Sequence, residues 1–143
     1  MPRNCRQRAM FATLNIIGGN MPERIQCKRT KGWRMPENTV YVGRPTRWGN
    51  PFYTGMVLTE REVYCSFFNS NVALQFIGIR LSAADAVFLY RDHVTNDRLG
   101  TPIIELFKDE LCGKNLACWC SLDKACHADV LLELANADNS NLG

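Results

Sequence analysis

Hydrophobic and polar positions along the chain divide it into short elements. Residues 24–29 (RIQCKR) alternate polar and apolar side chains, which predicts an edge strand. Residues 39–43 (TVYVG) are β-branched and aromatic, and they lie between two proline-containing segments, which predicts a buried strand. A third apolar run at residues 114–120 (KNLACWC) predicts another short buried strand near the C-terminus.

Helical periodicity fills the sequence between and after these strands. Residues 101–111 (TPIIELFKDEL) predict a helix with Pro102 at its first position, and Gly113 can end this helix in a left-handed conformation. Residues 126–137 (CHADVLLELANA) predict the final helix. Two further helices are expected after capping patterns, in which an acid follows a hydroxyl residue by three positions. These patterns are Thr59 with Glu62, and Ser82 with Asp85.

Strands near both ends, with helices between and after them, predict an α/β fold. We expect a small single-domain sandwich whose central sheet is at least partly parallel and is flanked by helices. The domain is expected to span residues 21–137, because GGNMP at 18–22 interrupts the pattern. Residues 1–20 are then an N-terminal extension, and residues 138–143 are a flexible tail.

Length and cysteine content limit the cellular setting. A chain of 143 residues can bury a single hydrophobic core. Its seven cysteines are an odd number without the regular spacing of a disulfide framework. We find no convincing export signal and no apolar stretch of the roughly 20 residues that span a membrane. These features favour a cytoplasmic protein without membrane contact, and they leave the oligomeric state open.

Charge is distributed unevenly, although the net formal charge is only +3. Residues 1–48 hold ten Lys and Arg residues and two acidic residues, whereas residues 49–143 hold seven Lys and Arg residues and twelve acidic residues. Most of the N-terminal basic residues are arginines, interleaved with Trp33 and Trp48. Arginine binds phosphate or carboxylate through a planar fork and stacks on aromatic rings, so this mixture favours an anionic nucleotide or nucleic acid. A solvated basic face is the alternative.

The segment around the last predicted strand is rich in metal-ligand residue types. Cys118, Cys120, Cys126 and His127 could converge, and four such groups match the ligand count of structural zinc. The spacing argues against this interpretation, because one residue rather than two separates Cys118 from Cys120, and adjacent residues such as Cys126 and His127 tend to diverge. We therefore assign no metal and no cofactor, and keep structural zinc as an alternative.

Cys126 has a second possible role at the start of the final helix. A thiolate there is stabilised by backbone N–H groups, which would make Cys126 a candidate nucleophile. For Cys118 and Cys120 we favour the interpretation that they are buried and act as small hydrophobes. His127 and Asp129 open a helix directly after a central strand, at the carboxyl edge where open α/β folds bind ligands.

The loop at residues 43–52 (GRPTRWGNPF) is expected to leave the same sheet edge as the corner at residues 120–127 (CSLDKACH). If a pocket lies between them, we expect its catalytic residues to be Asp123, Cys126 and His127. The expected ligand-binding residues are Arg44, Arg47, Trp48, Asn50 and Asp129. In this pocket Trp48 could stack on a flat ring and the arginines could hold a phosphate or carboxylate. The alternatives are that Trp48 fills the core and that Asn50 forms a turn.

Residues 24–52 (RIQCKRTKGWRMPENTVYVGRPTRWGNPF) together with 113–136 (GKNLACWCSLDKACHADVLLELAN) resemble the domain-of-unknown-function family 4326, found in bacteriophages and bacteria. The resemblance covers about Met21 to Asn136 and is weakest in the middle. It implies that both blocks belong to one domain, and it implies no activity. Cys27 and Ser121 stand where relatives are expected to have a basic residue and a proline, so neither is a good candidate for an essential role.

Three functional classes follow from these features. The first is an enzyme of nucleotide or glycosyl chemistry that binds a small anionic nucleotide- or nucleoside-like ligand in the pocket. The second is a non-catalytic phage protein that sequesters a nucleotide-like defence signal. The third is a nucleic-acid or protein interaction module with a structural zinc site, which would use the basic residues 28–34 (KRTKGWR). We rank the small-ligand pocket first, and the sequence does not decide between conversion and capture.

Overall fold

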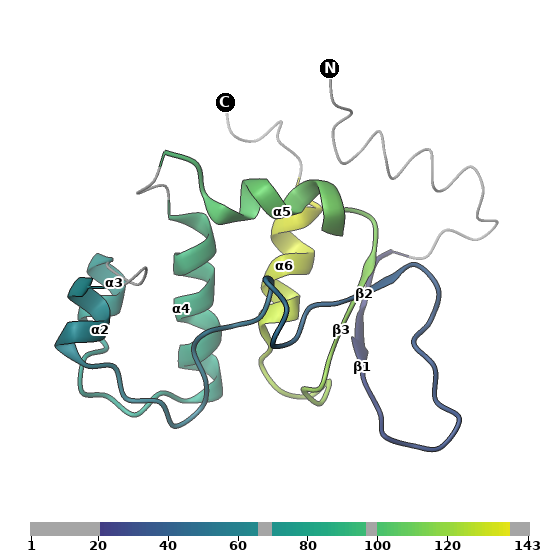
Figure 1. The fold of residues 1–143 in the computed structure, drawn as a ribbon, viewed down its shortest axis with the longest axis horizontal. Coiled ribbons are helices and arrows are strands. Elements are labelled where there is room, and N and C mark those ends of the chain that lie inside the picture. The colour runs from purple at the N-terminus through teal and green to yellow at the C-terminus, as the bar shows by residue number, and fades with distance from the viewer. Residues whose placement is uncertain (1–20, 66–69, 97–99, 138–143) are drawn as a thin grey trace.

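Three short strands form one parallel sheet at the centre of the domain (Figure 1). The computed structural model describes residues 21–65, 70–96 and 100–137. Strand β3 (Asn115–Cys118) lies between β1 (Arg24–Gln26) and β2 (Thr39–Tyr41), so the order is β1-β3-β2. Both pairings are parallel. This confirms the predicted α/β class and makes the described sheet fully parallel.

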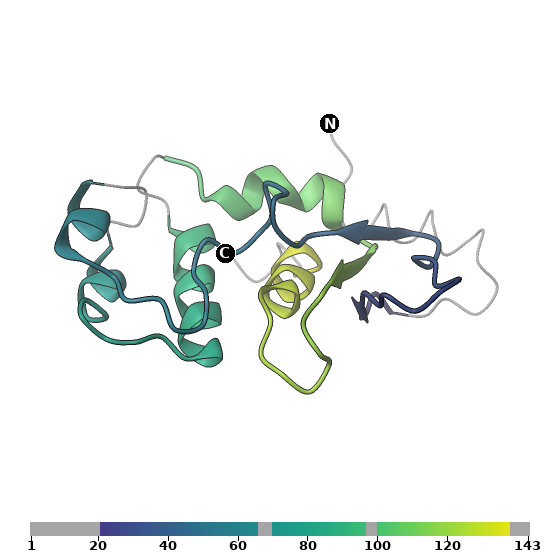
Figure 2. The same cartoon turned by 60° about the horizontal axis from the view of Figure 1, so that its bottom comes forward.

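Five helices are present in the described part of the chain, and α6 (His127–Ala135) has the most extensive packing on the sheet. It contacts β3 and β1. The helices α4 (Ala83–Thr95) and α5 (Ile103–Leu111) pack against α6 and against each other. The short helices α2 (Glu60–Cys65) and α3 (Asn71–Leu74) lie beyond α4, at the end of the molecule far from the sheet (Figures 1 and 2).

The predicted capping signals are confirmed where the structure describes them. The Thr59 hydroxyl accepts a hydrogen bond from the Glu62 N–H, and the Glu62 carboxylate accepts one from the Thr59 N–H. Ser82 and Asp85 form the same reciprocal pair at the start of α4. Pro102 is not the first helical residue, because its ψ of 143° is extended, and α5 begins one residue later. Gly113 has the expected positive φ, at 74°.

Two hydrophobic clusters fill the interior, and α4 contributes to both. One cluster joins the sheet to α4, α5 and α6, and includes Val42, Tyr90, Leu116 and Leu131. The other lies between α4 and the α2–α3 region, and includes Phe52, Leu58, Val63 and Leu89. Because the segment that follows β2 supplies buried residues to both clusters, its path across the domain is fixed at Val42 and at Phe52.

The expected N-terminal extension (1–20) and C-terminal tail (138–143) lie outside the described residues. Within the described part, none of the helices has the length and apolar character that crossing a membrane requires.

Candidate functional site

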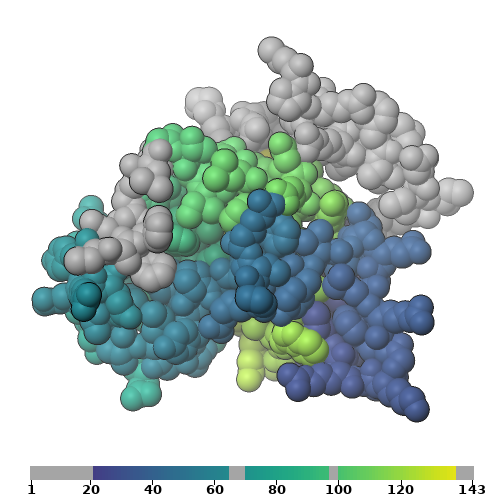
Figure 3. Space-filling view, in the orientation of Figure 1, coloured from purple at the N-terminus to yellow at the C-terminus, as the bar shows by residue number. Residues whose placement is uncertain are grey.

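A pocket lies at the carboxyl edge of the parallel sheet. Strands β2 and β3 end at Tyr41 and Cys118, and both residues line a cavity of about 260 Å³. The other lining residues come from the loop after β2, from the first turns of α4, and from the corner between β3 and α6. The structure thus brings together the two segments that the sequence placed on one edge. Figure 3 shows the corner emerging below this loop on the same face of the molecule.

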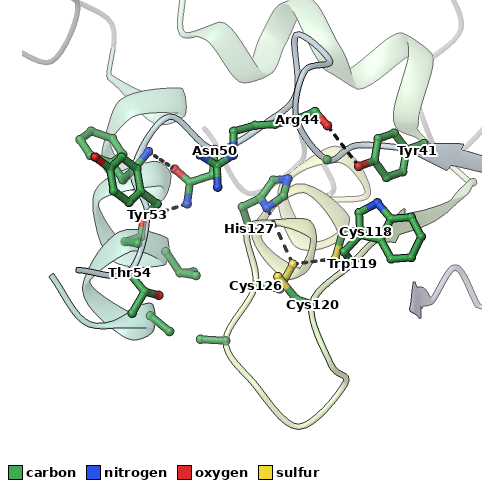
Figure 4. A pocket seen from close by; sticks show the side chains of 16 residues that line it. Tyr41, Arg44, Asn50, Tyr53, Thr54, Cys118, Trp119, Cys120, Cys126 and His127 are labelled. Atoms are coloured by element: carbon green, nitrogen blue, oxygen red, sulfur yellow. Dashed lines mark hydrogen bonds between the residues drawn. The ribbon is translucent and has the colours of Figure 1, made fainter. Parts of the chain in front are cut away.

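Aromatic side chains stand on opposite sides of this pocket. In Figure 4, Tyr53 and Thr54 lie on one side, Tyr41 and Trp119 lie on the other, and His127 is between them. Part of the lining is apolar, with contributions from Phe52, Ala83, Ala86 and Val87. A flat, partly apolar molecule would be in contact with rings and methyl groups in such a pocket.

Arg44 is the basic residue of the loop that reaches this pocket. It is exposed, and its guanidinium carbon lies 5.7 Å from the centre of the Tyr53 ring. Among the described residues, no carboxylate forms an ion pair with Arg44. Its charge is therefore available to an anionic group in the pocket.

Asn50 lines the pocket but uses its side chain to hold the loop in place. Its amide nitrogen donates to the Ala86 carbonyl at 3.1 Å, and its amide oxygen accepts from the Phe52 N–H at 2.9 Å. The residue is buried, so both bonds are shielded from water. These contacts match the turn-forming alternative and tie the loop to α4.

Arg47 and Trp48 are not among the residues that line the pocket. The Trp48 ring packs edge-on against Phe107 of α5, with 6.3 Å between the ring centres. Arg47 forms an ion pair with Glu110 of α5, and its guanidinium lies 4.9 Å from the centre of the Trp48 ring. The geometry thus agrees with the core-filling alternative for Trp48, and both residues attach the loop to α5.

Arg24 organises the corner between β3 and α6, and our sequence reasoning missed it. Its Nη2 donates to the carbonyls of Leu122 at 2.7 Å and Lys124 at 3.1 Å, and its Nε pairs with Asp129 at 3.2 Å. The Arg24 side chain is only 7% exposed. Asp129 is therefore engaged by Arg24, and it is not among the pocket-lining residues.

Three cysteine sulfurs converge at the base of the pocket. The Sγ atoms of Cys118, Cys120 and Cys126 all lie within 4.8 Å of one another, and Cys118 and Cys126 are 2.9 Å apart. Cys118 is buried, as expected for the strand, and Cys126 at the helix start is buried as well. The expectation that Cys120 is buried is wrong, because β3 ends at Cys118 and Cys120 is exposed in the turn that follows.

The His127 ring lies beside the Cys126 sulfur. Its Nε2 is 2.8 Å from the Val42 carbonyl, and its Nδ1 is 3.7 Å from the Cys126 Sγ. Because a carbonyl only accepts, Nε2 carries the proton, and in the neutral ring Nδ1 presents its lone pair to the sulfur. The expected divergence of Cys126 and His127 is wrong, because Cys126 is an extended N-cap residue with φ −146° and turns its side chain toward its neighbour.

The surroundings of Cys126 favour its thiolate. Hydrogen bonds from Cys118 and from the Ala128 N–H lower the pKa of Cys126 to about 3, against the effect of burial. The same contact with Cys126 raises the pKa of Cys118. A thiolate beside an imidazole nitrogen can act as a nucleophile, and clustered thiolates can also hold a soft metal ion.

Asp123, the third expected catalytic residue, lies apart from this group. It is exposed in the turn before Cys126 and is not a lining residue of the pocket. A hydrogen bond from the Ser121 side chain lowers the pKa of Asp123. A general acid needs a raised pKa, so this environment is unfavourable for proton donation.

Comparison with known proteins gives one family match. The model of the family described as a domain of unknown function, DUF4326, matches residues 25–137, which include the sheet, both pocket segments and α6. Comparisons with curated proteins and with solved structures give no match.

Proposed function

The chain belongs to the DUF4326 family, and from its pocket we propose that it binds a small anionic ligand of nucleotide or nucleoside type. The observation that carries this proposal is Arg44, which stands in an aromatic-lined pocket without an acidic partner among the described residues. A guanidinium placed in this way can form charge-assisted hydrogen bonds to a phosphate or carboxylate.

Arg29 brings further positive charge to the side of the pocket. The connection between β1 and β2 exposes Lys28, Arg29, Lys31 and Arg34. The Arg29 guanidinium lies 5.2 Å from the centre of the Trp119 ring, and Trp119 lines the pocket. This charge supports an anionic ligand and raises its local concentration near the pocket mouth.

The size of the cavity limits the ligand. Pockets that hold drug-sized molecules have volumes of roughly 300–1,000 Å³. At about 260 Å³ this cavity is slightly smaller, which suits a base with its sugar and one phosphate better than a dinucleotide. The rings of Tyr41 and Tyr53 are available for contact with the base, and Arg44 for contact with the phosphate.

Capture and conversion of the ligand remain separate hypotheses. Cys126 and His127 line the pocket, and their catalytic role stays a prediction. Capture of a nucleotide-like signal requires the same pocket and no reactive group. Single-turnover analysis of the bound ligand by mass spectrometry distinguishes the two hypotheses, because only conversion changes the mass of the released molecule.

Matched arginine variants test the binding proposal. We expect nucleoside monophosphates to bind at least ~10-fold more tightly than the corresponding nucleosides, because the phosphate adds a charge-assisted contact. Arg44→Ala should remove this difference, whereas Arg47→Ala should keep it, since Arg47 is paired with Glu110 outside the pocket. Isothermal titration calorimetry with four nucleotides and their nucleosides measures both effects.

Two results would overturn the binding proposal. One is the absence of binding by every nucleotide and nucleoside tested. The other is equal loss of affinity in the Arg44 and Arg47 variants. Tight binding of oligonucleotides with a steep dependence on salt would instead favour the nucleic-acid module, because phosphate contacts release counterions.

A further inference from the structure

We propose that Cys118, Cys120, Cys126 and His127 bind one Zn²⁺ ion at the base of the pocket. This site does not depend on the identity of the pocket ligand. It is argued from the positions of the four side chains, which come from the end of β3, the turn after it and the start of α6 (Figure 4).

The separation of the three sulfurs suits one metal ion. Zinc binds thiolates at about 2.3 Å, so two thiolates of a tetrahedral site stand about 3.8 Å apart. The sulfurs of Cys118, Cys120 and Cys126 already lie within 4.8 Å of one another. The sulfurs of Cys118 and Cys126 are 2.9 Å apart, so they need to separate by about 0.9 Å to reach this tetrahedral spacing. The exposed Cys120 gives the ion a route from solvent.

His127 is the fourth ligand that we propose. It lies outside the group whose ligand atoms are all within 4.8 Å of one another, so the sulfurs and the ring must draw closer as the ion binds. Its Nδ1 lies 3.7 Å from the Cys126 Sγ, close to the separation of about 3.6 Å that zinc–sulfur and zinc–nitrogen bond lengths give in a tetrahedral site. Metal-bound histidines usually donate their other ring N–H to a carbonyl or carboxylate, which fixes the tautomer. Here Nε2 is 2.8 Å from the Val42 carbonyl, so the ring is already held with Nδ1 as the ligand atom.

Arg24 supplies the charge that such a site requires. Three thiolates and a neutral imidazole around Zn²⁺ leave one negative charge, which is costly in a partly buried position. Arg24 lies at this corner, where its Nη2 donates to the carbonyls of Leu122 and Lys124. The Arg24 side chain is more than nine-tenths buried, and its Nη1 has no hydrogen-bond partner among the described residues. This atom is available as a donor to a zinc-bound thiolate.

Zinc content of single-cysteine variants tests the site directly. The full chain is expressed with zinc, purified under reducing conditions without a metal-affinity step, and analysed for metal by mass spectrometry. We expect about one zinc per chain in the wild type and below ~0.1 in Cys120→Ser, because each thiolate contributes to affinity. Cys120 is exposed, so this variant leaves the core intact. Cys27→Ser is the control, since Cys27 lies outside the cluster, and it should keep the full zinc content.

Cobalt titration tests the coordination geometry. Co²⁺ added to the metal-free protein should give the visible absorbance of a tetrahedral site and a near-ultraviolet thiolate band. Cys118→Ser and Cys126→Ser should weaken the thiolate band. His127→Asn should lower zinc affinity at least ~10-fold in competition with a chromophoric chelator, while the thiolate band remains.

Three outcomes would overturn the zinc site. One is a folded wild-type protein that contains no zinc and takes up neither Zn²⁺ nor Co²⁺. A second is a zinc content that is unchanged in Cys120→Ser or is lost equally in Cys27→Ser. The third is a Cys118–Cys126 disulfide that persists in protein purified under reducing conditions.

Discussion

The two segments that form the pocket use their conspicuous side chains in different ways. In the loop at residues 43–52, Trp48 packs on Phe107, and Asn50 bonds to backbone groups of α4 and of the loop itself. At residues 118–127, the sulfurs of the three cysteines converge on one another in the pocket, and His127 Nδ1 lies 3.7 Å from one of them, the Cys126 Sγ. The loop is therefore mainly a framework that presents Arg44, whereas the corner gathers three thiols at one point.

This difference shows how a functional group can be separated from a structural one. A tryptophan or an asparagine in a glycine- and proline-rich loop is conspicuous in the sequence, but its packing and hydrogen bonds explain its presence. Cys118 and Cys126 also belong to the hydrophobic core, but packing alone does not explain why three thiols gather at one point, an arrangement that suits a metal ion or a reaction. Substitutions in the two segments should accordingly affect different properties.

The largest expected effect on stability is in the framework of the corner. Arg24→Ala removes a buried guanidinium that bonds to the carbonyls of Leu122 and Lys124 and pairs with Asp129. We expect a loss of about 4 kcal/mol in the free energy of unfolding, because two charge-assisted hydrogen bonds from the buried guanidinium to the carbonyls are lost, whereas the half-exposed Asp129 adds little. Urea denaturation measures it, with Arg91→Ala as the control for an exposed ion pair. Equal small losses in both variants would mean that Arg24 does not organise the corner.

Trp48→Ala should be the next most damaging substitution. It removes a ring that is partly buried against the hydrophobic core and packs on Phe107 of α5. A loss of about 3 kcal/mol is expected from the cavity and the lost burial. Trp119→Ala is the matched control, because Trp119 is half exposed and should cost far less stability. If Trp48→Ala abolished ligand binding at unchanged stability, Trp48 would belong to the pocket after all.

Asn50→Ala should have an intermediate effect. It leaves the Ala86 carbonyl and the Phe52 N–H without their buried partner. We expect about 2 kcal/mol of destabilisation from these unsatisfied groups, measured by the same denaturation. Asn71→Ala, at an exposed position of α3, should be nearly neutral in comparison. Nearly equal values for the two variants would contradict the structural role of Asn50.

The smallest effect is expected at Arg47. Its ion pair with Glu110 is about half exposed on both sides. Arg47→Ala should therefore change the free energy of unfolding by less than about 1 kcal/mol. A thermal melt at low and high salt checks this, since an exposed pair is screened by salt. A large loss that salt does not reduce would show that Arg47 contributes through packing on Trp48.

Most of the fold could be predicted from local patterns. β1 follows from alternating polar and apolar residues, β2 and β3 follow from short β-branched or apolar runs, and α4 follows from the Ser82 and Asp85 capping pattern. The four-residue α3 was not predicted, because so short a helix has no periodicity, although Ser70 caps it. The prediction that the two pocket segments leave the same sheet edge followed from taking the strands now seen as β2 and β3 to be parallel neighbours.

The partners of individual side chains could not be predicted in the same way. Arg24 reaches carbonyls that are 98 and 100 positions away, and Arg47 meets Glu110 on α5. Such contacts depend on how elements far apart in the sequence pack against one another, and local sequence patterns do not show this. The approach of Cys126 to His127 depends on one extended N-cap residue, and helix geometry alone argues against it.

Native mass spectrometry of the chain with an added nucleoside monophosphate tests the account most directly. The pocket and its metal site predict a complex of one chain, one zinc ion and one nucleotide, with the nucleotide lost in Arg44→Ala and retained in Arg47→Ala. A wild-type spectrum that shows only the bare folded chain at every nucleotide concentration would contradict both the ligand pocket and the zinc site.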